Sequence, residues 1–492
     1  MLDEILTAAA RGEVMAAPSF VAGDWSRAGT AVDRVGPWLR EVVTTAWEPD
    51  HDTVRRATAT AAGYAREIAR LSPAHRAAIL ERASAVAREH RDRLALVLAR
   101  ELGKPVADGG REIDRVSDTF AVCAAEARRI GGEVLPVAGW DVGTGTTAMT
   151  FRAPLGVALA ITPFNAPANL LAHKLGASFA AGNTTLVKSP PQAPAATAAV
   201  VAILLAAGMP AAGVQLLHGG GELGARLCAA PEVAVISFTG SAATGAAVAR
   251  AAGAKRLVLE LGGNAATIVC DDADVGHAAR VCARTGYSNS GQSCISVQRV
   301  YAHASVFDDF VERMRKEVGD LTVGDPSDSA TDVGSMVDDE AAARVESWIG
   351  DAVAGGAQLV HGGTREGATL RPAIVARPRP DATIVTDEAF GAVVAVLPFD
   401  DFGDVVEQCN GSRYGLQAGL FTQRIDRMFQ AWRDLQVGGL IVNGSSNFRL
   451  DHVPFGGVKD SGFGRESPAQ MIEDYTQVKT MIVRGSSIWG DA

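Results

Sequence analysis

The stretch that decides the fold is VAVISFTGSAATG, residues 233–245. Its first six residues form an apolar run typical of a buried strand, and the small residues after it lead into a helical pattern. Ser241 stands where it could cap that helix and donate to a phosphate, although a capped helix alone would have the same residues. The stretch therefore predicts a strand, a glycine turn and a helix, which is the repeating unit of a nucleotide-binding sheet.

Similar strands lie on both sides of this unit, with helix-like stretches between them. They are VALAIT (157–162), TTLVK (184–188), VQLL (214–217) and LVLE (257–260). This alternation predicts a doubly wound parallel sheet, with a nucleotide at the carboxyl ends of its strands.

A second α/β alternation follows Gly263 and predicts a second domain. Its helices are expected near 274–287, 306–318 and 341–354, and its strands near 297–302 and 393–397. Residues 53–129, by contrast, are helix-like throughout, with a break at Ser72-Pro73.

A second glycine loop, GGGELG at 219–224, competes for the phosphate. It follows a strand, opens a helix and matches GxGxxG, so Gly221 is a candidate contact. The acidic residue expected about twenty positions further on, as a ribose ligand, is absent.

Composition excludes several classes of function. The chain has 492 residues, enough for two or three domains, and a net charge of −10 with no basic stripe, so we expect no nucleic-acid partner. Its six cysteines show neither CxxC pairs nor metal-ligand spacing, which predicts no metal site and a reducing, cytoplasmic location. We expect no signal peptide and no membrane span, because no basic leader and no apolar run of about 18 residues is present.

The candidate chemistry centres on Cys294, in YSNSGQSCI at 287–295. A thiol nucleophile, a carboxylate base at Glu260 and an amide donor at Asn165 are the parts needed to oxidise an aldehyde through a thioester. Each residue alone has an ordinary alternative, as a buried cysteine or a helix-capping group.

Several motifs occur together in one order along the chain. They are TPFN (162–165), Lys188, FTGS (238–241), ELGG (260–263), NSGQSC (289–294), EAFG (388–391), YGL (414–416) and PFGGVKDSGFGRE (454–466). This ordered set resembles the signature of the aldehyde dehydrogenase superfamily, of the NAD(P)-dependent, non-CoA-acylating type, over about residues 101–484. Residues 1–50 do not show that family's usual first strands.

The resemblance implies an α/β fold in three parts. A Rossmann-type parallel-sheet cofactor domain would comprise 1–132 and 152–261, and an α/β catalytic domain 262–465. A β oligomerisation arm and tail would comprise 133–151 and 466–492. Strands near 132–137, 145–152 and 475–483 would form this arm and pair with a neighbour's sheet, which gives a homodimer or homotetramer.

The resemblance also assigns roles at the site. Cys294 would attack the aldehyde, Asn165 and the Cys294 backbone N–H would hold the oxyanion, and Glu260 would deprotonate the hydrolytic water. The cofactor, NAD or NADP, would contact Ile161, Thr162, Pro163, Phe164, Lys188, Gly221, Phe238, Gly240, Ser241, Leu261, Gly262, Glu388 and Phe390.

One departure from the family pattern concerns the cofactor. The glutamate that the family places three residues after the lysine is replaced by proline in Lys188-Ser189-Pro190-Pro191. A 2′-phosphate would then meet no repulsion. This predicts NAD use with NADP tolerated, or the reverse preference.

The positions that resemble the family's aldehyde tunnel are unusually polar. They are Asn169, Leu170, His173, Ser293, Ile295, Arg449 and Phe455. Enzymes for long or aromatic aldehydes tend to carry bulky apolar groups there, so we predict a short polar aldehyde with an anionic group, paired by Arg449. The alternative is that Arg449 bridges to Asp451 or points to solvent.

Two other functions compete. A CoA-acylating semialdehyde dehydrogenase would pass the thioester to a thiol, but such relatives often lack the residue seen here as Glu260. A thiol hydrolase or acyltransferase would need a histidine beside Cys294, and the nearest in sequence are His277 and His303.

Overall fold

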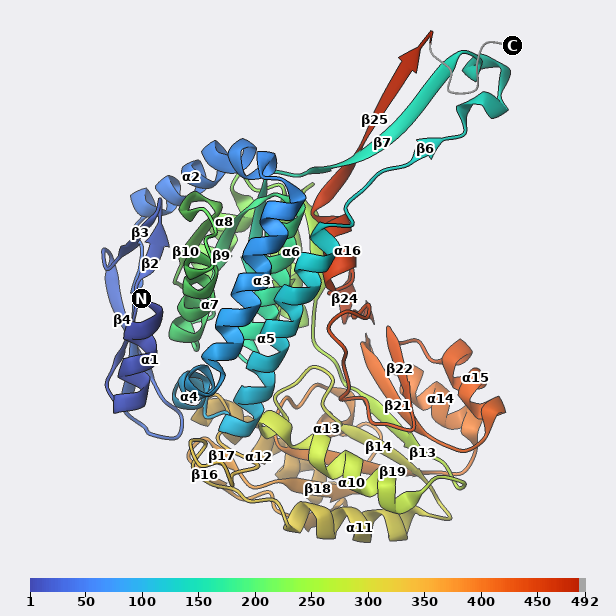
Figure 1. Cartoon of the computed structure of the whole chain (residues 1–492). Coiled ribbons are helices and arrows are strands. Elements are labelled where there is room, and N and C mark those ends of the chain that lie inside the picture. The colour runs from blue at the N-terminus through green and yellow to red at the C-terminus, as the bar shows by residue number, and fades with distance from the viewer. Residues whose placement is uncertain (486–492) are drawn as a thin grey trace.

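The computed structural model describes residues 1–485, and its centre is an eight-stranded sheet in the order β24-β12-β11-β8-β9-β10-β2-β3 (Figure 1). The five middle strands run parallel, while β24, β2 and β3 are antiparallel additions at the two ends. Their bounds are β2 (Ser19–Val21), β3 (Asp24–Ser26), β8 (Val157–Ile161), β9 (Thr184–Lys188), β10 (Val214–Leu217), β11 (Val235–Thr239), β12 (Arg256–Glu260) and β24 (Gly462–Phe463). The predicted doubly wound sheet is confirmed, with strand ends within two residues of the expected ones.

Both faces of this sheet are buried, and alternate side chains of one strand supply the two cores. In β8, Ala158 and Ala160 pack into the core on one face, and Val157 and Leu159 into the core on the other. This burial explains why the strand is apolar throughout, as expected of a parallel sheet covered on both sides.

The covering helices divide between the two faces. Elements of the first core include α3 (Pro73–Glu89), α5 (Val106–Ala127), α6 (Pro167–Ala181) and α7 (Pro194–Ala206). Elements of the second core include α2 (His51–Arg70), α8 (Gly221–Ala229) and α9 (Ala242–Ala252).

The helical region has more breaks than the sequence predicts. Besides the break at Ser72-Pro73, α3 ends at His90 and α4 (Arg91–Leu102) ends at Gly103, which has a left-handed φ of 70°. The boundary at His90 has neither glycine nor proline, so the sequence does not mark it. Gly103, followed by Lys104-Pro105, is a C-cap signal, but it lies within a long helix-rich composition.

The first fifty residues, whose sequence shows no clear strands, form α1 (Leu2–Arg11) and five short strands. Besides β2 and β3 these are β1 (Met15–Ala17), β4 (Thr30–Val35) and β5 (Val42–Glu48), which form a sheet in the order β1-β5-β4. Strands β1, β2 and β3 have three residues each, too few to show a periodicity, whereas β4 and β5 have six and seven residues. Ile5 and Leu6 of α1 are fully buried.

A second, seven-stranded sheet has its own core and the order β15-β18-β19-β14-β13-β21-β22. Its strands are parallel except β15. The bounds are β13 (Ala266–Val269), β14 (Arg299–His303), β15 (Gln358–His361), β18 (Ala373–Ala376), β19 (Val393–Phe399), β21 (Gln417–Phe421) and β22 (Gly439–Val442). Its helices include α10 (Val275–Gly286), α11 (Phe307–Gly319), α12 (Asp339–Ala354), α14 (Phe402–Asn410) and α15 (Ile425–Asp434), so the predicted second α/β unit is present.

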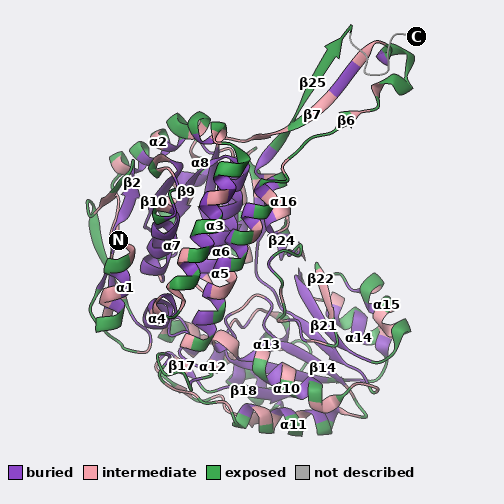
Figure 2. Cartoon of the chain, in the orientation of Figure 1, coloured by how far each residue is buried: buried purple, intermediate pink, exposed green. Residues whose placement is uncertain are grey.

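A three-stranded arm projects from the body (Figure 1). It has the order β25-β7-β6, with β6 (Val134–Leu135), β7 (Thr146–Pro154) and β25 (Thr476–Arg484). The residues of β25 after Thr476 are exposed, as the green strand in Figure 2 shows. Residues 486–492 of the expected tail lie outside the described residues, and the domain boundaries stay a prediction.

None of the helices in residues 1–485 combines the length and the apolar character that a bilayer span requires.

Candidate active site

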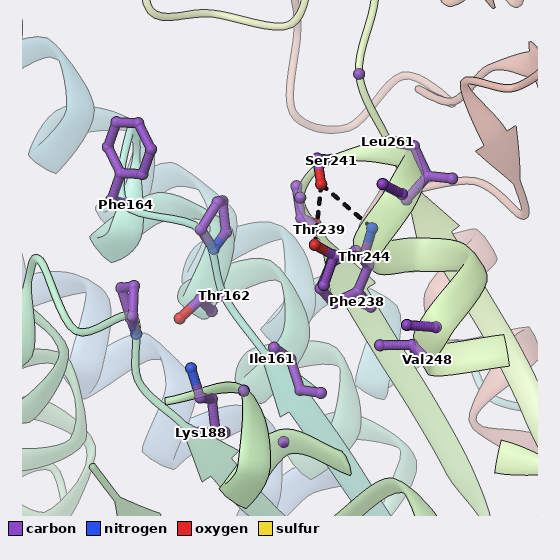
Figure 3. Close-up of a pocket in the computed structure, with 18 of the residues that line it drawn as sticks. Ile161, Thr162, Phe164, Lys188, Phe238, Thr239, Ser241, Thr244, Val248 and Leu261 are labelled. Atoms are coloured by element: carbon purple, nitrogen blue, oxygen red, sulfur yellow. Dashed lines mark hydrogen bonds between the residues drawn. The ribbon is translucent and has the colours of Figure 1, made fainter. Parts of the chain in front are cut away.

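A cavity of about 760 Å³ lies at the carboxyl ends of the central strands. The strand register sets these ends side by side, because Ile161 of β8 pairs with Lys188 of β9 and with Phe238 of β11, and Thr239 of β11 pairs with Glu260 of β12. All of the predicted cofactor residues line this cavity: Ile161, Thr162, Pro163, Phe164, Lys188, Gly221, Phe238, Gly240, Ser241, Leu261, Gly262, Glu388 and Phe390. Figure 3 labels seven of them, Ile161, Thr162, Phe164, Lys188, Phe238, Ser241 and Leu261.

One part of the cavity is shaped for phosphate. Ser241 caps α9, where its Oγ accepts a hydrogen bond from the Thr244 N–H at 3.2 Å and lies 2.9 Å from Thr244 Oγ1 (Figure 3). The first N–H groups of a helix have no partner within it and carry a partial positive charge. The α9 terminus therefore fits a pyrophosphate.

The two competing glycine loops lie at the same cavity. Gly220, Gly221 and Gly224 line it together with Gly240 and Ser241. The sequence left open which of the two loops lies at the cofactor cavity. Both do, because they follow strands β10 and β11 at the same edge of the sheet.

Lys188 brings a cation to the same wall. Burial lowers the pKa of its ammonium to about 8, and the negative charge of Glu48 opposes this effect. Its side chain points into the cavity in Figure 3, where it suits ribose hydroxyls or a phosphate.

Glu388 and Phe390 mark another part of the cavity. Glu388 Oε1 accepts a hydrogen bond from the Gly263 N–H at 2.8 Å, and burial raises the pKa of this carboxyl to about 7. A Cβ at Gly262 would lie 2.4 Å from Glu388 Oε2, so only glycine admits the carboxylate here. Phe390 has a φ of 48°, costly for a bulky residue, and its ring meets Phe164 edge to face at 5.8 Å.

The loop before Cys294 is held in a strained conformation. Asn289, Ser290 and Gly291 all have left-handed φ, at 50°, 56° and 74°. Asp108 of α5 fixes the loop, because its carboxylate accepts from the Asn289 N–H at 2.7 Å and from the Ser288 hydroxyl at 2.9 Å. Such strain persists only where surrounding contacts impose it, and it is common where a reactive side chain is presented.

Asn165 lines the cavity together with Cys294. Its side-chain Nδ2 donates to the Gln292 backbone carbonyl at 2.9 Å. The backbone carbonyl of Asn165 accepts hydrogen bonds from Lys104 Nζ at 2.6 Å and from Asn289 Nδ2 at 3.1 Å. One amide hydrogen and the backbone are thus fixed, which leaves the second amide hydrogen for a ligand.

Glu260 lies behind the cavity wall, which its neighbours Leu261 and Gly262 line. Only 3% of its surface is exposed, and neither carboxylate oxygen has a hydrogen-bond partner among residues 1–485. Burial, with a further contribution from the charge of Glu466, raises the pKa of Glu260 well above its ordinary value. A carboxyl of this kind is unusual outside functional sites, since buried polar atoms are normally paired.

Cys294 is a free, partly exposed thiol. Burial, followed by the negative charges of Glu388 and Glu260, raises its pKa to about 12. The thiol is therefore protonated at neutral pH, and attack requires that a base remove its proton.

The predicted substrate residues divide into two groups. Leu170 lines the cavity, and Ile295 and Phe455 form a small apolar cluster with Leu416, against which Cys294 packs. Ser293 accepts from the Ile295 N–H at 3.4 Å.

The other group is withdrawn from the cavity. Asn169 and His173 are fully buried on α6, and Arg449 is 7% exposed at its side chain. Arg449 donates to Glu466 Oε1 at 3.1 Å and to the Glu466 carbonyl at 2.8 Å, so Glu466, which the sequence did not indicate, is its main partner. Its Nε also lies 3.6 Å from Asp451 Oδ1, which is the ion pair that the alternative predicted.

Sequence reasoning missed several cavity residues. Thr244, Ala247, Val248 and Ala251 share one face of α9, and their spacing after Ser241 could have predicted them. Arg344 of α12 also lines the cavity and donates to the Ala389 carbonyl at 3.0 Å, but nothing in its local sequence indicates this position.

A dinucleotide-sized cavity at the switch edge of a parallel sheet has beside it a thiol, an amide and a carboxyl that has no hydrogen-bond partner among residues 1–485. This arrangement is the one expected of a nucleotide-dependent oxidoreductase. Residues 25–481 match the family model described as "Aldehyde dehydrogenase family". The chain belongs to this family and is an NAD(P)-dependent aldehyde dehydrogenase.

Individual relatives agree. The chain is 37% identical over 465 residues to a 3-sulfolactaldehyde dehydrogenase of Priestia aryabhattai, covering 94% of this chain and 97% of the relative. It is 36% identical over 408 residues to a sulfoacetaldehyde dehydrogenase of Neptuniibacter caesariensis, covering 83% and 90%. Among solved structures, the NADP-dependent glyceraldehyde-3-phosphate dehydrogenase from Bacillus halodurans C-125, complexed with NADP, matches with a TM-score of 0.93 and 30% identity over 96% of this chain and all of that chain.

Proposed function

We propose that Cys294 is the nucleophile of this aldehyde dehydrogenase, Asn165 its oxyanion donor and Glu260 its general base. The observation that carries the proposal is that Cys294 and Asn165 line the same cavity as the predicted cofactor residues. The buried carboxyl of Glu260, which has no hydrogen-bond partner among residues 1–485, is close enough for its charge to raise the pKa of the Cys294 thiol.

The residues then divide the work. Cys294 gives its proton to a base and adds through its sulfur to the aldehyde carbon, and the second amide hydrogen of Asn165 stabilises the oxygen that becomes negative. A nicotinamide held beside Glu388 and Phe390 would supply the hydride acceptor that is needed to turn the Cys294 adduct into a thioester. Glu260 takes a proton from water while the water oxygen adds to the thioester carbon. The C–S bond then breaks, the carboxylic acid is released, and the proton held by Glu260 returns to the Cys294 sulfur.

The proposed substrate is a short polar aldehyde with an anionic group. The names of similar proteins support this class, because they include 3-sulfolactaldehyde, sulfoacetaldehyde and aspartate-semialdehyde dehydrogenases. Lactaldehyde dehydrogenases are also similar to the chain, which keeps neutral hydroxyaldehydes within the class to be tested.

We expect Asn165→Ala to lower kcat about 10²- to 10³-fold, the usual effect of losing one oxyanion donor. Steady-state kinetics with any accepted aldehyde would measure this. Because the Asn165 side chain makes one hydrogen bond, to Gln292, the unfolding temperature should fall only slightly. A kcat within threefold of the unchanged enzyme would contradict the assigned role.

For the cofactor we expect kcat/KM values for NAD and NADP within about a thousandfold of each other. Pro190 and Pro191 line the cavity where the family's glutamate would repel a 2′-phosphate, and Lys188 adds a cation. Initial rates with both cofactors at saturating aldehyde test this. Rejection of NADP beyond that factor would show that another group, such as Glu48 near Lys188, replaces the missing carboxylate.

The CoA-acylating alternative is disfavoured because Glu260 is present and buried beside the nucleophile. An assay with and without coenzyme A distinguishes the two, since only the acylating reaction depends on the added thiol.

We also propose a cytoplasmic homodimer or homotetramer. In residues 1–485, β25 is hydrogen-bonded to β7 on one side and ends the sheet on the other, with Val478 and Ile482 59% and 63% exposed. An open apolar edge of this kind favours pairing with a second copy. The six free cysteines suit a reducing compartment.

A further inference from the structure

Asp451 is the centre of an unusual set of contacts beside the site. Its Oδ1 lies 2.7 Å from Arg115 Nη2, 2.9 Å from His173 Nε2 and 3.3 Å from Asn169 Nδ2, and Arg449 Nε lies 3.6 Å away. Its Oδ2 accepts from Arg115 Nε at 2.9 Å. Polar groups of three separate segments therefore converge on one carboxylate oxygen.

This cradle, Arg115, Asn169, His173 and Arg449, has more hydrogen-bonding capacity than Asp451 uses. His173 and Arg449 are both more than nine-tenths buried at their side chains, yet His173 Nδ1 and Arg449 Nε have no hydrogen-bond partner among residues 1–485. Buried groups without a partner are costly, so they indicate a site that a further ligand completes.

The charges of the region also favour an anion. Among residues 1–485, three cations, Arg115, Lys174 and Arg449, form ion pairs with two carboxylates, Asp451 and Glu466. The carboxyl of Glu260 also feels the charges of Lys174 and Arg449 but forms no ion pair with them. Burial alone would raise the pKa of Glu466, but Lys174 and Arg449 outweigh it and lower this pKa to about 2, so the carboxylate stays charged. Within these ion pairs the cations outnumber the carboxylates by one, which favours an anionic ligand.

The cradle is adjacent to the nucleophile. The Arg449 guanidinium lies 4.1 Å from the centre of the Phe455 ring, and Phe455 belongs to the cluster against which Cys294 packs. Asn169 and His173 stand on α6, the helix that follows Asn165 in the chain. A molecule with its aldehyde at Cys294 and an anionic group at the cradle would therefore be short.

Asp451 is carried by an irregular segment whose neighbouring apolar side chains are exposed. Residues 443–457, between β22 and β23 (Val458–Lys459), form neither helix nor strand. Asp451 is buried while its neighbours Leu450 and Val453 are 47% and 44% exposed. Withdrawing the carboxylate into water would thus disturb little apolar packing.

We propose that Asp451 is an internal counter-ion whose carboxylate occupies the binding site for the substrate's anionic group, so that sulfonate or carboxylate aldehydes bind by displacing it. Asp451 then sets specificity without touching the reacting atoms. The inference rests on the proposed class of substrate.

The first test does not depend on activity. Asp451→Ala vacates the cradle, so 50 mM sodium methanesulfonate, against sodium chloride at equal ionic strength, should raise its unfolding temperature by roughly 2–4 °C. Wild type and Asp381→Ala, which breaks an exposed pair with Arg379, should shift by less than about 1 °C. Asp451→Asn preserves the side-chain volume and serves if the alanine variant does not fold. Absence of a sulfonate-specific shift in the folded variant would overturn the proposal.

The second test is kinetic. Removing the competing carboxylate should lower KM for sulfoacetaldehyde about tenfold and leave KM for propanal within about twofold. A rise in KM for sulfoacetaldehyde, or equal changes for both aldehydes, would instead make Asp451 a positioning residue for Arg115. Should wild type prefer propanal, the proposed substrate class fails, while the methanesulfonate shift still decides the role of Asp451.

Discussion

Cys294→Ala is expected to abolish aldehyde oxidation, with kcat lowered by about 10⁴-fold or more, as for other enzymes that lose their nucleophile. Without the sulfur no thioester forms, and the hydrolytic step has no substrate. Cys294 is partly exposed and packs at the edge of the apolar cluster of Ile295, Leu416 and Phe455. The substitution should therefore affect folding little. Cofactor reduction at saturating aldehyde, followed by absorbance, measures the loss.

Cys228→Ala is the matched control. Cys228 also lines the cavity, but from α8, and burial raises the pKa of its thiol to about 11. Its removal should leave kcat within about threefold of wild type. More than 1% residual activity in the Cys294 variant, or a comparable loss in the Cys228 variant, would move the nucleophile elsewhere.

The cofactor cavity could be predicted from sequence because each of its parts is local. A strand, a glycine turn and a helix follow one another within VAVISFTGSAATG, and parallel pairing alone brings Ile161, Lys188 and Thr239 to one edge. Glu388 and Phe390 were predicted from the order of the family motifs instead, because they lie in the loop before β19 of the second, seven-stranded sheet.

The substrate side could not be predicted in the same way. Asp451 is 336 residues from Arg115 in sequence, and the pair has no local signature. Arg449 was expected to face a substrate or to bridge Asp451; it does lie 3.6 Å from Asp451, but a loop that folds back also pairs it with Glu466, which the sequence did not indicate. Partner choice among buried charges depends on how such loops close, and a single sequence does not show this.

The second large effect is expected for Glu260→Gln. This near-isosteric change removes the base but keeps the volume, so kcat should fall about 10²- to 10⁴-fold, the usual contribution of a general base. If Glu260 acts after the thioester has formed, the variant should still give a stoichiometric burst of reduced cofactor and then stall. Rapid-mixing absorbance would show this burst.

The pH profile gives this prediction a second readout. Burial raises the pKa of Glu260 well above its ordinary value, and only the ionised form accepts a proton. Hydrolysis by wild type should therefore quicken as the pH rises through that raised pKa, while the Gln variant should lose this dependence on Glu260.

Hydroxylamine, a nucleophile that needs no base, should release the acyl group and restore turnover in the variant. Glu407→Gln, on the exposed surface of α14, should behave as wild type. Loss of the burst together with failure of hydroxylamine would place Glu260 before the thioester, as the base that deprotonates Cys294, whose own pKa of about 12 demands such a partner.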